Sequence, residues 1–161
     1  MLQPSSEAYR LIKSFEGFRS RAYKALKTEK YFTIGYGHCS QYVRARDIVT
    51  TEDAEILLDQ DVALFSSQLA TDCPNLNQRQ YDALVSLIYN IGWCRFRYSM
   101  TYVTCRNIGI TTTDLDAARR IVLWVKSADK VILGLQKRRV IEANHFLGRD
   151  HFELVNGEII G

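Results

Sequence analysis

The stretch from Ser14 to His38, SFEGFRSRAYKALKTEKYFTIGYGH, decides how the chain is organised. Upstream of it, serines that can cap a helix precede apolar residues at helical spacing, and Gly17 is a residue type that often follows a helix C-terminus. This pattern predicts a helix over residues 5–16 that ends on Glu16. A carboxylate is disfavoured at the negative end of a helix dipole, so a purely stabilising role explains Glu16 poorly.

Two β-prone segments follow this helix, at residues 23–25 and 31–34, with a polar segment between them. The pattern predicts a β-hairpin. Gly35 and Gly37 permit tight turns, and a third short strand is expected near residues 41–43. A carboxylate ahead of a hairpin that ends in a hydroxyl and a glycine-rich turn is compatible with an acid-catalysed site, but these residues alone do not identify one.

The rest of the chain is predicted to be helical, which makes the fold α+β. A segment over about 51–70 has one apolar face and is long enough to act as a spacer between two lobes. Asn77 and Gln80 form a capping-box pattern ahead of an unusually apolar helix, which we expect to be the buried centre of the larger lobe. Further helices are expected at about 99–106, 114–127 and 134–148. The tail that follows is expected to be either a short strand or partly disordered.

Composition limits the classes of function. The 161 residues are 47% hydrophobic and 24% charged, which is typical of one globular domain with its own core. A net charge of +3 is small for a nucleic-acid-binding domain. It fits a protein that acts on an anionic partner such as a bacterial cell wall, and it equally fits no special partner. No segment approaches the roughly 18 apolar residues of a membrane span, and the N-terminal residues do not resemble a secretion signal.

Common catalytic and metal-binding motifs are missing from the sequence. The three histidines have no suggestive neighbours, and neither a phosphate-binding loop nor a dinucleotide fingerprint is present. We therefore expect no metal and no other cofactor. The cysteines lack metal-ligand spacing, so we predict free and mostly buried thiols, with two disulfides as the alternative for an exported protein. They stand at Cys39, Cys73, Cys94 and Cys105.

Several motifs, in the same order along the chain, resemble those of the phage-type lysozymes, the endolysin and muramidase family. The similarity covers about residues 5–148, and so many ordered matches make coincidence a poor explanation. The matching segments are FEG at 15–17, AYK at 22–24, TIGYGH at 33–38, QYDALVS at 80–86, YNIG at 89–92, Trp124, GL at 134–135, the pair Arg138-Arg139 and Glu142.

The resemblance implies a lysozyme-like fold and an activity. Residues 1–161 would form a single domain with a hairpin lobe over about 17–50 and a connecting helix over about 51–70. A helical lobe over about 71–148 would also take in helix 5–16, with the cleft between the two lobes. The implied reaction is cleavage of the β-1,4 bond between N-acetylmuramic acid and N-acetylglucosamine in bacterial peptidoglycan.

The resemblance places Glu16 as the general acid that protonates the glycosidic oxygen, and Thr33 as the residue whose hydroxyl holds the attacking water, with inversion at the sugar. One departure concerns the second catalytic group. The family usually carries an acid or a cysteine separated from the glutamate by eight intervening residues, and at that position this chain has Ala25. Sixteen residues, 17 to 32, separate Glu16 from Thr33, two more than is usual for the family.

Three explanations of this departure are open. Glu29, the only acid in the hairpin, serves as the second carboxylate. Alternatively, Thr33 with backbone and another polar group positions the water without a second carboxylate. In the third case the enzyme is impaired and is retained as a cell-wall-binding or phage structural module. A lytic transglycosylase outcome, with attack by the sugar's own hydroxyl, is a further alternative where the base is missing.

Four more residues are candidates for substrate binding through the same resemblance. Tyr23 offers an aromatic face of the kind that suits pyranose rings, although it also fits as a packing residue. Asn90 and Trp124 match positions near the family's cleft, but they also fit as a helix-end cap and a core aromatic. Arg138 is a candidate for substrate binding, and either Arg138 or Arg139 is a candidate for an ion pair with Glu16.

The resemblance also implies a setting for the protein. Peptidoglycan is the expected partner, without nucleic acid and without stable membrane insertion. The protein is expected to be a monomer that accumulates in the host cytoplasm and is released at lysis by a separate holin-like pore protein.

Overall fold

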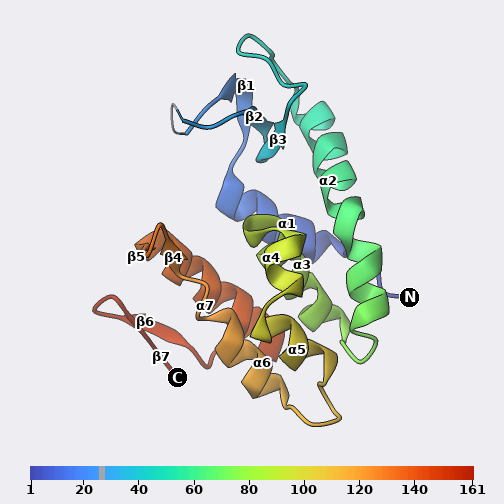
Figure 1. Cartoon of the computed structure of the whole chain (residues 1–161), viewed down its shortest axis with the longest axis vertical. Coiled ribbons are helices and arrows are strands. Elements are labelled where there is room, and N and C mark those ends of the chain that lie inside the picture. The colour runs from blue at the N-terminus through green and yellow to red at the C-terminus, as the bar shows by residue number, and fades with distance from the viewer. Residues whose placement is uncertain (26–27) are drawn as a thin grey trace. The chain divides into compact units, whose positions relative to one another are not determined.

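The structure is a computed structural model that describes residues 1–25 and 28–161 (Figure 1). The chain divides into two compact units. Ile12–Phe65 form the first, called here the sheet unit, and Met1–Leu11 with Ser66–Gly161 form the second, called the helical unit. Two helices, α1 (Ser6–Glu16) and α2 (Thr51–Asp72), contribute residues to both units. The combination of helices and small antiparallel sheets confirms the predicted α+β class.

A three-stranded antiparallel sheet in the order β1 (Arg19–Tyr23), β2 (Phe32–Gly35), β3 (His38–Ser40) characterises the sheet unit. The predicted hairpin is confirmed, but its strand limits are corrected. β1 begins at residue 19 rather than 23, because it is a polar and largely exposed strand that lacks apolar alternation. β3 begins at residue 38 rather than 41, because the turn from β2 is completed in two residues, with a φ of +99° at Gly37.

Gly35, the last residue of β2, lies where a side chain is excluded for two reasons. Its φ is +66°, and an added Cβ would lie 2.9 Å from Ala54 Cβ on α2. We expect Gly35→Ala to lower the free energy of unfolding by about 2–4 kcal/mol, because backbone strain adds to an overpacked contact that side-chain rotation cannot relieve. Chemical denaturation measures this loss.

Gly17 supplies the matched control for this prediction. Its φ is +64°, but an added Cβ would meet nothing within 4 Å. Gly17→Ala should therefore cost only the backbone strain, about 1 kcal/mol. Equal losses for the two variants would show that the contact between Gly35 and Ala54 contributes nothing.

The helix predicted over 51–70 is present and extends two residues further, to Asp72. Thr50 caps it, since its hydroxyl oxygen accepts a hydrogen bond from the backbone N–H of Asp53 at 3.1 Å. The apolar face predicted from the sequence is buried at Ala54, Leu58 and Val62.

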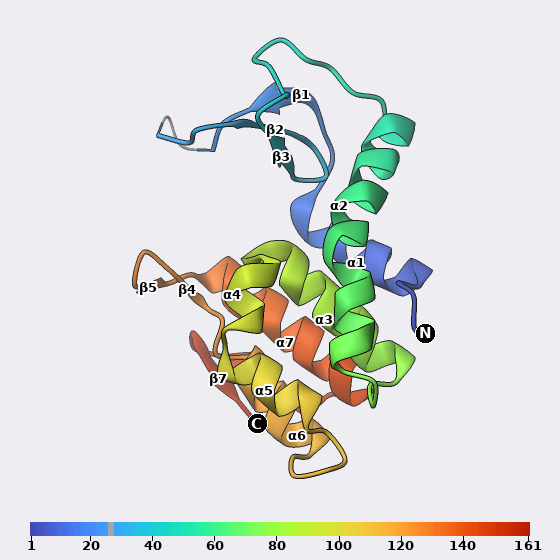
Figure 2. The same cartoon turned by 45° about the vertical axis from the view of Figure 1, so that its right-hand side comes forward.

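The centre of the helical unit is α3 (Gln78–Ile91). The predicted capping box is present: the Gln80 N–H donates to Asn77 Oδ1 at 3.1 Å, and the Asn77 N–H donates to Gln80 Oε1 at 2.9 Å. Residues 80–88 are buried without interruption. Helix α7 (Leu133–Leu147) packs along α3, as both views show (Figures 1 and 2). The expectation of a buried central helix is confirmed.

Three shorter helices complete this unit: α4 (Trp93–Arg97), α5 (Met100–Arg106) and α6 (Asp114–Ile121). The sequence predicted α5 but not α4. It also carried α6 six residues too far, to 127. The segment after Ile121 instead leaves the helix and forms a hairpin of β4 (Lys126–Ser127) and β5 (Lys130–Val131). The C-terminal tail forms a second hairpin of β6 (Glu153–Val155) and β7 (Glu158–Ile160).

All four cysteines are free, as predicted, but only two of them are buried. Cys73 and Cys105 are buried, whereas Cys39 and Cys94 are exposed. Burial raises the pKa of the Cys73 thiol to about 12, which keeps it protonated and unreactive near neutral pH. Within the described ranges, no helix has the length and apolar character needed to cross a bilayer.

Candidate active site

Glu16, the proposed proton donor, is the last residue of α1 and is half-buried. The helix ends there because Gly17 adopts a left-handed conformation while its N–H still donates to the Lys13 carbonyl at 3.0 Å. Among the carboxylates of α1, Glu16 is thus placed at the end where the helix dipole opposes a negative charge.

Tyr23 and Thr33 are directly paired across β1 and β2. Paired residues of neighbouring strands project from the same face of a sheet, so the phenol ring and the hydroxyl are neighbours. Burial raises the pKa of the Tyr23 phenol, and the Arg19 guanidinium, 4.7 Å from the ring centre, partly opposes this shift. The phenol therefore stays protonated at neutral pH and can donate a hydrogen bond.

Glu29 is hydrogen-bonded to the two residues that directly follow β1, Lys24 and Ala25. Its Oε2 accepts a hydrogen bond from the Ala25 N–H at 2.9 Å, and its main-chain carbonyl accepts one from Lys24 Nζ at 2.5 Å. The residue is half-buried. The carboxylate of Glu29 therefore lies beside the backbone of position 25, where the resemblance noted in the sequence leads us to expect an acid or a cysteine.

His38 has a carboxylate partner that the sequence did not suggest. Its Nδ1 lies 3.0 Å from both carboxylate oxygens of Asp61, on α2, twenty-three residues away. The hydrogen bond from the imidazole to Asp61 raises the pKa of His38, and partial burial only partly opposes this. The expectation that the histidines lack suggestive neighbours is wrong for His38. This contact joins β3 to α2, and it positions the strand next to the one that carries Thr33.

The His38–Asp61 pair predicts a pH dependence of stability. Because the pKa of His38 is raised in the folded state, the pair stabilises fully below the ordinary value of 6.5, and this contribution is lost as the pH rises through the folded-state pKa. His38→Gln should remove this contribution. The difference in urea midpoint between the wild type and His38→Gln is therefore expected to shrink as the pH rises from acidic to alkaline. A difference that is constant across the series would contradict the assignment.

Trp124, in the segment after α6, is fixed at several points. Its indole Nε1 donates to Thr101 Oγ1 at 2.9 Å, and the Arg95 guanidinium lies 5.6 Å from its ring centre. Its main-chain carbonyl accepts a hydrogen bond from Arg139 Nε at 3.0 Å. The side chain is half-buried, so part of the indole stays accessible.

A buried ionic cluster on α7 contains Arg138, Arg139 and Glu142. Arg139 and Glu142 are fully buried, and Arg138 is 4% exposed. Arg138 Nε donates to Glu142 Oε1 at 2.9 Å, Arg139 Nη1 donates to Glu142 Oε2, and the Ser86 hydroxyl donates to Glu142 Oε1 at 2.7 Å. Ser86 belongs to the segment 80–86 singled out in the sequence, but the sequence did not indicate its hydrogen bond to Glu142.

Asn90 is linked to the same cluster. Arg139 Nη2 donates to Asn90 Oδ1, and Asn90 itself is an exposed residue in the last turn of α3. One guanidinium thus connects Asn90, the Trp124 carbonyl and Glu142.

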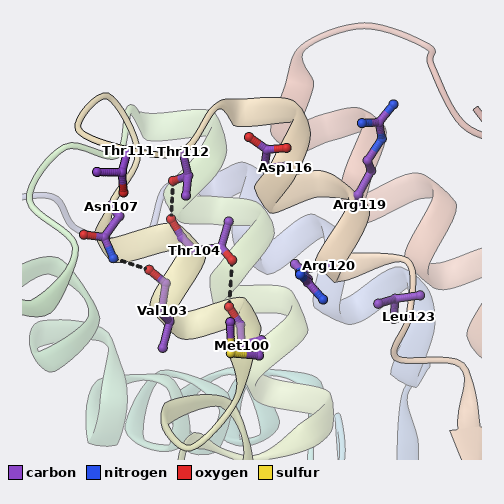
Figure 3. A pocket seen from close by; sticks show the side chains of 10 residues that line it. All are labelled: Met100, Val103, Thr104, Asn107, Thr111, Thr112, Asp116, Arg119, Arg120 and Leu123. Carbon is purple, nitrogen blue, oxygen red and sulfur yellow. Dashed lines mark hydrogen bonds between the residues drawn. The ribbon is translucent and has the colours of Figure 1, made fainter.

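A pocket of about 550 Å³ lies between α5 and α6 in the helical unit (Figure 3). None of the predicted site residues lines it. The Thr104 hydroxyl donates to the Met100 carbonyl and the Thr112 hydroxyl donates to the Thr104 carbonyl, both at 2.8 Å (Figure 3). Both hydroxyl protons are therefore used in hydrogen bonds to the backbone. The other residues that line the pocket are both apolar and polar: Met100, Val103, Asn107, Thr111, Asp116, Arg119, Arg120 and Leu123.

The predicted site residues therefore fall into two groups. The sheet unit carries Glu16, Tyr23, Glu29 and Thr33, and the structure places Tyr23 opposite Thr33. The helical unit carries the others, of which Asn90 and Trp124 are linked through Arg139, while Arg138 binds Glu142.

Comparison with known proteins gives one consistent result. Residues 13–142 match the family model described as Phage lysozyme. The endolysin of Bacillus phage PZA is 42% identical over 142 residues, which cover 88% of this chain and 54% of the relative. The chain spans about half the length of this relative and of the similar endolysin of Bacillus phage B103.

Solved structures agree with this match. The muramidase domain of SpmX from Asticaccaulis excentricus superposes with a TM-score of 0.81 at 32% identity, covering 91% of this chain and 99% of that chain. An endolysin from Escherichia coli O157:H7 phage FAHEc1 gives a TM-score of 0.75 at 30% identity, covering 91% of this chain and 94% of that chain. Both cover nearly all of this chain.

Proposed function

The chain belongs to the phage lysozyme family, and on this basis we propose that it is an endolysin-type muramidase. It hydrolyses the β-1,4 bond between N-acetylmuramic acid and N-acetylglucosamine in bacterial peptidoglycan. The observation that carries the proposal is the family match over residues 13–142, in which a carboxylate at the end of α1 precedes a sheet that bears Thr33.

Glu16 and Thr33 have separate roles in the proposed reaction. The Glu16 carboxyl transfers its proton to the glycosidic oxygen as the bond from that oxygen to the anomeric carbon breaks. A water molecule held by the Thr33 hydroxyl attacks the same carbon from the opposite face, so the product is inverted. A base accepts the proton that this water releases.

Glu29 is the proposed base. Its carboxylate oxygen lies 2.9 Å from the main-chain nitrogen of Ala25. The longer hairpin therefore places the Glu29 carboxylate close to Ala25, whose methyl side chain cannot act as an acid or a base. An inverting pair leaves room for water between the carboxyl groups, and we expect the carboxyls of Glu16 and Glu29 to be separated by about 6.5–9.5 Å.

Four other residues are proposed to bind the glycan. Tyr23 lies opposite Thr33, where its protonated phenol can donate a hydrogen bond to a sugar hydroxyl. Asn90 is exposed and Trp124 is half-buried, so both can contact substrate directly. Arg138 is almost fully buried, so we propose that it acts on the glycan through its positive charge rather than by direct contact.

The setting of this activity is part of the proposal. The protein acts as a monomer on the cell wall, after accumulating in the host cytoplasm and passing through a separate pore protein. Expression in a bacterial host tests this sequence of events. We expect cells that express the chain alone to stay intact, and cells that also express a pore-forming protein to lyse. Lysis by the chain alone would oppose this sequence of events.

The activity is tested by loss of turbidity in a suspension of permeabilised bacteria. We expect the wild-type chain to clear the suspension, because cleaved glycan strands no longer hold the wall together. Sedimentation with intact wall material, without clearance, would overturn the enzymatic proposal in favour of a non-catalytic wall-binding module.

A further inference from the structure

The orientation of the Asn90 amide in the structure carries an inference about what the site recognises, and it rests on the proposed function. A guanidinium has five N–H donors and no acceptor. Arg139 therefore has to face the oxygen of the Asn90 amide, as the bond from Nη2 to Oδ1 shows. The amide nitrogen, with its two N–H donors, then points away from Arg139.

Burial fixes this orientation firmly. Arg139 is 0% exposed, and it is held by Glu142 on one side and by the Trp124 carbonyl on the other. Turning the amide over would bring its N–H groups against the guanidinium and would remove an acceptor from a buried cation, which costs more than losing a bond at the surface.

The amide nitrogen is available for a ligand. Asn90 is exposed, and within the described part of the chain no residue accepts a hydrogen bond from its Nδ2. The same guanidinium also fixes the main chain at Trp124, whose half-buried indole is the second proposed contact of this unit.

We propose that Arg139 is a positioning residue that makes Asn90 a fixed hydrogen-bond donor, and that this donor selects an acceptor oxygen of the glycan strand, such as an acetamido carbonyl or a carboxylate. Arg139 does not touch the substrate. It determines which end of the Asn90 amide the substrate meets.

Asn90→Asp tests this proposal because it changes the exposed group and little else. One carboxylate oxygen still accepts from Arg139, now with a charge-assisted bond, so stability is retained or increased. The other oxygen replaces the donor with an acceptor. We expect KM for soluble peptidoglycan strands to rise by about tenfold or more, with kcat changed by less than about threefold, because the substrate loses a hydrogen bond in recognition and meets a repulsive oxygen in its place.

Asn156→Asp, in the turn between β6 and β7, is the matched control and should leave KM unchanged. Arg139→Lys tests the positioning role through a double-mutant cycle. With the amide no longer fixed, Asn90→Asp should raise KM less in the Arg139→Lys background than in the wild type. Additive effects on KM would show that Arg139 only supports the fold.

The outcomes separate this inference from the proposed function. A wild type that fails to cleave peptidoglycan would overturn the proposed function. An active wild type together with an Asn90→Asp variant of unchanged KM would overturn the inference alone. If Arg139→Lys does not fold, the Asn90→Asp and Asn156→Asp pair still decides the donor role.

Discussion

Glu16→Gln is expected to reduce the rate of wall clearance by about a hundredfold to ten-thousandfold, the range that general acid catalysis usually supplies. Glutamine is close in size to glutamate and can still form hydrogen bonds, but it cannot give a proton to the glycosidic oxygen. Initial rates of turbidity loss at matched protein concentrations measure the effect. The urea midpoint of the variant should stay close to that of the wild type.

Glu7→Gln provides the control on the same helix. Glu7 lies in the first turn of α1, where it forms an ion pair with Arg10. Its replacement removes the same charge from the opposite end of α1 and should leave the clearance rate nearly unchanged. If Glu16→Gln clears walls as fast as the wild type, Glu16 is not the acid and the assignment of the site is wrong.

Glu29→Gln should lower the clearance rate by a similar factor, about a hundredfold or more, if Glu29 is the base. The glutamine carbonyl oxygen can still accept the Ala25 N–H, so the change removes the charge while the hydrogen bond that shapes the hairpin is retained. This design separates catalysis from hairpin structure. Glu29→Ala would lose both together.

Glu153→Gln, on the exposed strand β6 of the helical unit, controls for the change in net charge. It should be as active as the wild type. Full activity of Glu29→Gln would exclude Glu29 from the mechanism and leave Thr33 with backbone groups to position the water. A loss confined to Glu29→Ala would assign Glu29 a structural role in the hairpin.

The sequence predicted the helices best where periodicity and caps agreed. Asn77 and Gln80 predicted the start of α3, and both hydrogen bonds of the capping box are present. Helix α6 was predicted too long because apolar residues continue past Ile121 at helical spacing, whereas hydrogen bonds from distant residues set the course of this segment. Arg139 donates a hydrogen bond to the Trp124 carbonyl, and the Thr101 hydroxyl accepts one from the Trp124 indole. Neither contact can be predicted from the local sequence.

The two missed hairpins differ in how predictable they were. The turn of the C-terminal hairpin is Asn156-Gly157, with φ values of +51° and +84°, and this dipeptide is a strong hairpin signal that the sequence did offer. The turn between β4 and β5 is Ala128-Asp129, with φ values of +47° and +63°. Alanine rarely adopts such a conformation, so no local pattern indicates that turn.

The candidate site was predictable where the chemistry is local in sequence and unpredictable where it depends on packing. Glu16 and Thr33 belong to short motifs that can be read directly. The contact between Glu29 and Ala25 depends on how the hairpin closes, and the His38–Asp61 pair depends on how β3 lies against α2. The link from Arg139 to Asn90 joins residues forty-nine positions apart, so only the fold reveals it.

The chemical nature of the reducing end that the protein releases from purified peptidoglycan tests the central claim most directly. We expect wild-type protein to liberate fragments that end in a reducing N-acetylmuramic acid, with one equivalent of water incorporated per bond cleaved. Mass spectrometry of the digest, before and after borohydride reduction, measures this. An anhydro-muramic end would identify a transglycosylase, and wall material that gains no new ends while the protein remains bound to it would contradict the assignment of an enzyme.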